Sequence, residues 1–241
     1  MDKLFIVIPA YNEQDTLKEV IDQWYPIVEK YNGNGMSRLV IINDGSKDRT
    51  WEILQEKAKN LPLLQPLTKD NGGHGATVLF GYRYALEQGA DYVFQTDSDG
   101  QTLPEEFHAF WEERENYDMI IGWRRGRQDG LSRVFVTKVL KLFVRLCFGI
   151  SVKDANTPYR LMKAEKLQEY IGFVPDGFFL TNVLVTVLFT KKGSVRYLPI
   201  TFRPRQGGVN SINMKKIMKV GLQAWKDFRR INKEINQGEV K

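Results

Sequence analysis

Two aspartates, Asp97 and Asp99, stand one residue apart where an apolar run ends, in the stretch FQTDSDGQTLPEEF over residues 94–107. Two carboxylates this close repel each other, so a strand end has no structural need for both of them. Carboxylate oxygens with an amide oxygen nearby suit a hard divalent cation such as Mg²⁺ or Mn²⁺, which often keeps positions open for phosphate. The pair therefore predicts a divalent metal site, and the alternative is a turn with two solvated aspartates.

Three further polar clusters follow apolar runs: PAYNE at 9–13, NDGSKDRT at 43–50 and KDNGGHGA at 69–76. Asp44, at the end of the second run, could accept hydrogen bonds from a nucleobase or ribose. The alternative role is a cap for the next helix, which Asp48 could fill instead. His74 could donate to a phosphate, although a plain loop histidine is an equally good interpretation.

The first 122 residues alternate between strand and helix patterns. We expect strands at 4–10, 38–44, 62–68, 91–97 and 118–122, and helices at 13–31, 47–60, 74–89 and 103–115. This alternation predicts βαβ units in a mostly parallel sheet that helices cover on both faces. Ligands bind beyond the carboxyl ends of such strands, so the four polar clusters should meet at one site.

The remaining residues follow a different pattern. A basic loop at 122–133 leads to an apolar helix at 134–149, and helices from about 164 and over 179–190, a strand at 194–205 and a basic tail helix follow. The segment DANTPYRLMK at 154–163 carries no clear element. We find no linker, so we expect residues 1–241 to form one domain whose second half is built onto the sheet.

Composition narrows the function classes. The chain has 241 residues, a net charge of +6 and one cysteine, Cys147, which excludes an internal disulfide and fits a reducing compartment. The longest uncharged stretch, 177–190, is too short to span a bilayer, so we expect a soluble or peripheral protein. The glycine patterns of dinucleotide-binding and P-loop proteins are absent. A nucleic-acid partner is disfavoured because the predicted site is acidic.

The four motifs, in this order and spacing, resemble the family-2 glycosyltransferases of GT-A fold, and among them the polyprenyl-phosphate sugar synthases of the dolichyl-phosphate mannose synthase type. The resemblance implies a Rossmann-like three-layer sandwich with C-terminal helices on the acceptor side. It divides the chain into a nucleotide-sugar half (1–122), an acceptor half (123–212) and a basic C-terminal helix (213–241). It further implies a metal site at Asp97, Asp99 and Gln101, and nucleotide-sugar contacts from Pro9, Tyr11, Glu13, Asp44, Gly75 and Asp97.

The acceptor half carries further similarities. Gly122-Trp123-Arg124 resembles the family's G-x-R, and Arg133 with Thr137 resembles its lipid-phosphate contact. DANTPYR resembles a segment in which glycine usually stands at the position of Pro158. RQGGVNS, which starts at Arg205, resembles a diphosphate-binding stretch, with its serine displaced by one position. The resemblance implies an acceptor-phosphate site at Arg124, Arg133 and Thr137, and catalytic roles for Asp99, Arg124, Arg133 and Arg205.

These features predict an inverting, metal-dependent enzyme that moves a hexose from a UDP- or GDP-sugar to a polyprenyl phosphate. A hydroxyl acceptor is the alternative; it would need a general base, for which Asp99, Asp154 and Glu165 are the available carboxylates. A phosphate acceptor needs positive side chains instead, and the arginines after residue 123 favour it. A non-catalytic binding module is a third interpretation, which the complete set of donor-site carboxylates disfavours.

The tail over 214–235 has apolar residues at steps of three and four and basic residues on its other faces. This pattern predicts either a docked helix with a solvated basic face or an interfacial helix on anionic lipid. The apolar segment VFVTKVLKLFVRLCF at 134–148, with basic residues in and beside it, is a second candidate for the same surface. With a lipid acceptor, the second interpretation places the protein in the cytoplasm, peripherally associated with the cytosolic face of the membrane.

Overall fold

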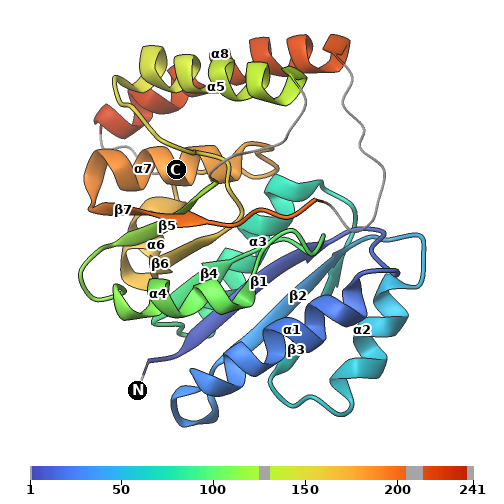
Figure 1. Cartoon of the computed structure of the whole chain (residues 1–241). Helices are drawn as coiled ribbons and strands as arrows, with labels where there is room; N and C mark the ends of the chain where they lie inside the picture. The colour runs from blue at the N-terminus through green and yellow to red at the C-terminus, as the bar shows by residue number, and fades with distance from the viewer. Residues whose placement is uncertain (1, 125–130, 205–213, 238–241) are drawn as a thin grey trace.

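The computed structural model describes residues 2–124, 131–204 and 214–237; the side chains of 34, 131–136 and 214–222 are outside the description. The described residues form a seven-stranded sheet in the order β3-β2-β1-β4-β6-β5-β7 (Figure 1). The strands are β1 (Leu4–Ala10), β2 (Arg38–Asp44), β3 (Leu64–Lys69), β4 (Tyr92–Gln95), β5 (Met119–Arg124), β6 (Arg160–Lys163) and β7 (Val195–Ile200).

The sheet is mostly parallel, as the sequence predicts. Strand β1 pairs in parallel with β2 and β4, β2 with β3, and β5 with β7. Strand β6, which the sequence analysis did not identify, is antiparallel to both of its neighbours, β4 and β5. Because β6 runs the opposite way, the segment that precedes it reaches the sheet edge where the other strands end.

Helices cover both faces of the sheet. They are α1 (Leu17–Lys30), α2 (Thr50–Ala58), α3 (His74–Glu87), α4 (Phe107–Glu112), α5 (Leu131–Phe148), α6 (Ala164–Ile171), α7 (Thr181–Lys192) and α8 (Met214–Gln237), with 3-10 turns at Gly33–Gly35 and Pro104–Glu106. One apolar cluster joins the sheet to α1, α2 and α4, and a second joins its other face to α3, α6 and α7. All seven residues of β1 are buried, as a strand covered on both faces requires.

Helices α5 and α8 lie side by side on the outer surface of α7, beyond the three layers (Figure 1). Phe148 of α5 and Phe228 of α8 meet with ring centroids 5.2 Å apart, and Phe228 also faces Phe178 at 6.2 Å. Ile231 and Ile235 of α8 are buried in the same cluster. The described apolar face of α8 therefore packs on the protein, which is the docked-helix interpretation of the tail.

Among the described residues, no helix has both the length and the apolar composition that crossing a bilayer demands. Helix α7, which contains most of the long uncharged stretch, is buried along nine consecutive residues from Thr181 to Phe189. Its uncharged character is explained by this burial within the fold.

Candidate active site

The predicted metal pair lies directly beyond the carboxyl end of β4. Ser98 is buried, and its carbonyl accepts a hydrogen bond from Thr16 Oγ1 at 3.2 Å, which joins this turn to the turn after β1. Asp97 and Asp99 are both partly exposed on either side of the buried Ser98, in the bend that follows β4. The side chain of Asp97 is 25% exposed.

The chemistry of these two carboxylates fits a hard divalent cation. Within the described parts of the chain, no group of three or more His, Cys, Asp or Glu residues gathers closely enough to enclose a metal ion. A cation held here would take two carboxylates from the protein and its remaining oxygen ligands from elsewhere. Open positions of this kind suit a metal that binds substrate phosphates.

Gln101, the third residue of the predicted metal set, has a clear structural role. Its side chain is buried, and its Nε2 donates to the carbonyl of Arg203 at 2.8 Å. Arg203 N in turn donates to the carbonyl of Gln101 at 2.8 Å. Gln101 therefore attaches the segment after β7 to the Asp97–Asp99 turn, and its role as a metal ligand stays a prediction.

Asp44 lies at the end of β2 and organises the glycine-rich loop after β3. Its Oδ1 accepts hydrogen bonds from Lys69 Nζ at 2.6 Å and from Gly72 N at 2.9 Å, and its Oδ2 accepts one from Gly73 N at 2.9 Å. Burial raises the pKa of Asp44, but the bonds from Lys69 and Gly72 outweigh burial, so the pKa lies below its usual value. The side chain is 4% exposed, and its contact with a nucleobase stays a prediction.

Hydrogen bonds also join the turns after β1 and β2. Asn12 has a positive φ of 53°; its backbone N donates to Ser46 Oγ at 3.0 Å, and its Oδ1 accepts from Lys47 N at 2.8 Å. Asp48 accepts from both Thr50 N and Thr50 Oγ1 and so satisfies the first N–H of α2, although the N-cap position itself is Arg49, whose side chain makes no capping bond. The first three strand ends therefore carry turns that hold one another in place.

The predicted nucleotide-sugar residues of PAYNE differ in their surroundings. Pro9 is buried in β1, and Glu13 is buried with its Oε2 accepting from Thr16 Oγ1 at 2.9 Å. Tyr11 is 44% exposed, although aromatic residues of this size are usually more buried. Of the three, Tyr11 has the side chain best able to lie against a bound base.

His74 is the first residue of α3 and contacts the predicted metal pair. Its Nε2 lies 2.9 Å from Asp97 Oδ1, and the imidazole is 48% exposed. Partial burial lowers the pKa of His74, but the charge of Asp97 and the hydrogen bond to it outweigh that effect and raise the pKa above its usual value. The sequence leaves the role of His74 open between a phosphate donor and a plain loop residue, and in the structure its imidazole contacts the carboxylate of Asp97.

Gly75 has a packing role at the same helix end. A Cβ atom at this position would lie 2.3 Å from the carbonyl oxygen of Phe178 and 2.7 Å from that of Phe179. Only glycine allows the start of α3 to approach the loop before α7 this closely. The predicted contact of Gly75 with the nucleotide sugar stays a prediction.

Arg124, at the carboxyl end of β5, forms a bidentate ion pair with Asp154. Its Nε and Nη2 donate to the two carboxylate oxygens at 2.8 and 2.9 Å, and both side chains are 7% exposed. The guanidinium also lies over the ring of Phe202, 5.0 Å from its centroid. The acceptor-phosphate role of Arg124 stays a prediction. In that role Arg124 would contact the phosphate while remaining paired with Asp154.

The sequence analysis missed Arg160, the first residue of β6. It is fully buried, and its guanidinium donates to the carbonyls of Ala155, Thr157 and Asn182 and to the hydroxyl of Thr186. These bonds hold the segment before β6 against α7. Arginine is usually exposed, and a four-residue strand is too short to show a burial pattern. No local feature of the sequence therefore indicated that Arg160 would be buried.

Several predicted residues lie partly or wholly beyond what the structure describes. Arg205 is outside the described residues, and Arg133 lies in α5 with an undescribed side chain. Thr137 is half-buried one turn further along α5. The roles of Arg133, Thr137 and Arg205 stay predictions.

Comparison with known proteins identifies similar chains. The profile of Glycosyl transferase family 2 matches residues 5–181. The undecaprenyl-phosphate mannosyltransferase of Micrococcus luteus is 26% identical and covers 94% of this chain and 98% of its own length. Polyprenol monophosphomannose synthase of Mycolicibacterium smegmatis is 24% identical over 89% of this chain and 83% of the relative. An undecaprenyl-phosphate 4-deoxy-4-formamido-L-arabinose transferase of Pseudomonas fluorescens is 30% identical over 81% of this chain, which spans 60% of that relative.

Solved structures share the fold. Glucosyl-3-phosphoglycerate synthase from Mycobacterium tuberculosis, in complex with Mn²⁺, UDP-glucose and phosphoglyceric acid, superposes with a TM-score of 0.70. The match is 18% identical in sequence and covers 96% of this chain and 80% of the other. At this identity the similarity shows a common architecture, with helices around a mostly parallel sheet.

Proposed function

The chain belongs to glycosyl transferase family 2, and from that premise we propose that it transfers a hexose from a nucleotide sugar to a polyprenyl phosphate. As a member of this family it is an enzyme, and its fold is of the GT-A type. The observation that carries the proposal is the pair of partly exposed carboxylates, Asp97 and Asp99, at the edge where the turns after β1 and β4 are hydrogen-bonded together.

On the donor side, Asp97 and Asp99 would hold a divalent cation together with the diphosphate of the sugar nucleotide. When bound, such a cation would stabilise the negative charge that develops on the leaving diphosphate. Asp44 would keep the glycine-rich loop in position through its bonds to Gly72 and Gly73. Mn²⁺ in the solved structure of the synthase from Mycobacterium tuberculosis supports the choice of a divalent ion.

On the acceptor side, the available carboxylates favour a phosphate over a hydroxyl. Glu165 lies at the opposite edge of the sheet, where it lines an open cleft with Asp2 and Asp91. Asp154 is held by Arg124 in the bidentate pair, and Asp99 is already needed for the cation. A phosphate is anionic near neutral pH and needs no general base, so it can attack C1 directly, with inversion.

The names of the relatives support the same acceptor class. Two of the relatives described above are undecaprenyl-phosphate sugar transferases, and a third is a polyprenol monophosphomannose synthase. We therefore propose a lipid phosphate as the acceptor and peripheral association with the membrane that contains it. A panel of donors is needed to identify the nucleotide base and the sugar.

A panel of UDP- and GDP-sugars tests this proposal, with Mg²⁺ or Mn²⁺ and with or without a short-chain polyprenyl phosphate. We expect one donor to give a glycosyl phosphate lipid, and only when the cation and the lipid phosphate are both present. Transfer to a hydroxyl acceptor, with no product from any polyprenyl phosphate, would replace the proposed function by its hydroxyl-acceptor alternative.

A further inference from the structure

Helix α5 presents an exposed face that mixes cations with large apolar side chains. Five exposed residues lie at steps of three and four and therefore on one face of the helix: Lys138, Lys141, Leu142, Arg145 and Leu146. Leu142 is 52% exposed and Leu146 is 61% exposed, the two largest values among the exposed apolar side chains of the described residues. None of the five positions is acidic. We call this set the α5 stripe.

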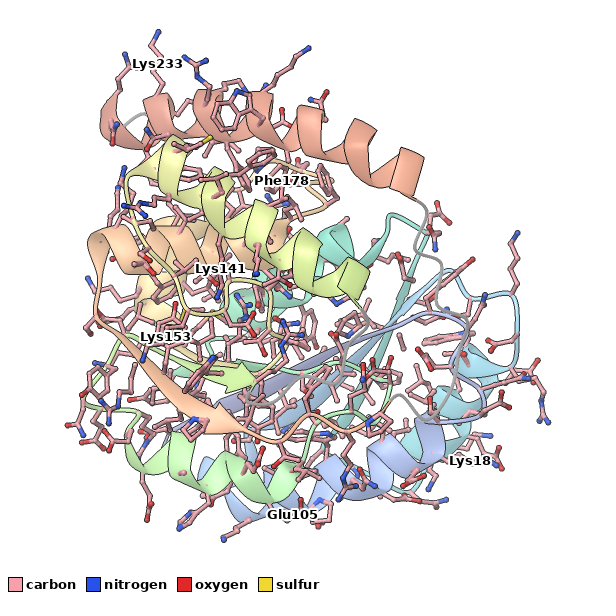
Figure 2. The ribbon with its side chains drawn as sticks, turned by 45° about the horizontal axis from the view of Figure 1, so that its top comes forward. Lys18, Glu105, Lys141, Lys153, Phe178 and Lys233 are labelled. Carbon is pink, nitrogen blue, oxygen red and sulfur yellow. The ribbon has the colours of Figure 1, made fainter. Side chains whose placement is uncertain are left out.

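The neighbouring surface of α8 continues the positive charge. Lys226, Arg229, Arg230 and Lys233 are exposed there, while Ala224, Phe228, Ile231 and Ile235 of α8 are buried. An open groove of about 530 Å³ runs between the two helices, with Leu146 and Cys147 on one side and Trp225, Arg229 and Lys233 on the other. Figure 2 shows Lys233 at the top of the molecule and Lys18, on α1, at the opposite side.

We propose that the α5 stripe and the adjoining α5–α8 groove form the surface that docks on an anionic lipid bilayer. This inference rests on the lipid-phosphate acceptor of the proposed function, and it specifies which face of the protein meets the membrane. It also differs from the expectation for the tail, because the apolar contribution comes from α5 and the described apolar face of α8 is already packed.

The chemistry of the stripe matches a bilayer surface. Lysine and arginine can keep their charged ends among anionic headgroups while their stems lie along apolar surface. Leu142 and Leu146, between these cations, can enter the boundary between headgroups and acyl chains. A solvated surface gains nothing from two exposed leucines, whereas a bilayer satisfies both kinds of side chain at once.

The position of α5 in the chain fits this arrangement. Strand β5 ends at Arg124 on the edge of the sheet that carries the site, and α5 begins seven residues later at Leu131. The phosphate of a polyprenyl lipid lies at headgroup depth. A protein that rests on α5 would therefore keep its acceptor side close to that depth.

Vesicle sedimentation tests the surface with variants at exposed positions. The variant K138Q/K141Q/R145Q should bind phosphatidylcholine vesicles containing phosphatidylglycerol on the order of 100-fold more weakly than wild type, because each basic residue near the surface contributes about 1 kcal/mol. The matched control is K18Q/K30Q/K59Q, which removes the same charge from exposed positions on α1 and at the end of α2. It should bind as wild type does.

A second pair of changes separates the apolar contribution. The variant L142S/L146S should bind the same vesicles at least about tenfold more weakly, because each leucine loses the gain from burial. Its binding should still weaken with added salt as that of wild type does, whereas the binding of the charge variant should depend less on salt. Equal binding by the α5 variants and the control would overturn the proposed surface.

Activity measurements distinguish this inference from the proposed function. All three variants should retain transfer to a short-chain polyprenyl phosphate in solution, since the changed residues lie outside the proposed site. If wild type transfers sugar to that acceptor but ignores the vesicles, the docking surface is wrong and the proposed function stands. If wild type binds vesicles through α5 but transfers sugar only to hydroxyls, the proposed function is wrong and the docking surface stands.

Discussion

The donor edge and the acceptor side of this protein are built in different ways. At the donor edge, turns that follow neighbouring parallel strands hold one another by hydrogen bonds, as Asp44 does for the loop that contains Gly72 and Gly73. On the acceptor side, Arg124 and Asp154 are thirty residues apart and meet because β6 is inserted antiparallel between β4 and β5. In the first region, polar turns meet because parallel strands end at the same edge of the sheet. In the second, the two partners meet because a reversed strand is inserted between β4 and β5.

This difference predicts how each region responds to change. Substitutions at the donor edge should affect catalysis or a single loop. Substitutions in the buried pair should affect the whole fold, because removing one partner leaves a charge without compensation. Four predictions test that contrast.

The largest expected effect is on catalysis at the donor edge. Replacing Asp99 by alanine should lower the rate of transfer by about a hundredfold to a thousandfold, since the loss of one electrostatically stabilising group commonly costs that much. The melting temperature should change little, because the side chain is partly exposed. Treating wild type with EDTA should remove activity to a similar extent, and full turnover in excess EDTA would refute the metal site.

An intermediate effect is expected in the buried pair. Asp154→Asn should reduce the free energy of unfolding by about 3 kcal/mol, because Arg124 would remain buried without its carboxylate. A double-mutant cycle with Arg124→Gln, followed by urea denaturation, measures how much of this loss depends on the pair. Independent, additive losses would show that the two residues do not stabilise each other and would remove the contrast between the regions.

The variant Arg124→Lys tests whether Arg124 has a functional role besides its ion pair with Asp154. Lysine keeps the charge but loses the planar fork, so it should restore only part of the stability. If Arg124 also binds the acceptor phosphate, this variant should raise the KM for the lipid more than the KM for the nucleotide sugar. An equal rise in both would move Arg124 away from the acceptor.

The smallest effect is expected at Asp44, and it depends on pH. The pKa of Asp44 is lowered in the folded protein, so the stability it contributes is present above the unfolded-state pKa of about 4 and is lost as pH falls through the folded-state value. Asp44→Asn should therefore cost about 2 kcal/mol at neutral pH. The difference from wild type should shrink in acid, and a difference that stays constant from neutral pH to pH of about 2 would contradict this account.

Much of the donor edge could be predicted from sequence because its signals are local. The continuous apolar run of β1 and the carboxylates after β4 each depend on neighbouring residues, and the structure has them where they are expected. Asp48 likewise accepts a hydrogen bond at the start of α2, one residue before the N-cap Arg49. The family resemblance is likewise confirmed by the match over residues 5–181. The individual roles of the site residues, from Pro9 to Arg205, stay predictions.

The sequence alone determined the alternation of strands and helices, the parallel sheet and the edge that carries the carboxylates, because hydrophobic periodicity and turn chemistry are properties of short segments. Only the tertiary structure decided that RLMK would be a reversed strand, that Arg160 would be fully buried, and that the described apolar face of α8 would pack on the protein while α5 exposes two leucines. Those outcomes depend on which distant surfaces remain uncovered once the sheet has formed. Burial is set by partners far away in the chain, and no local pattern records them.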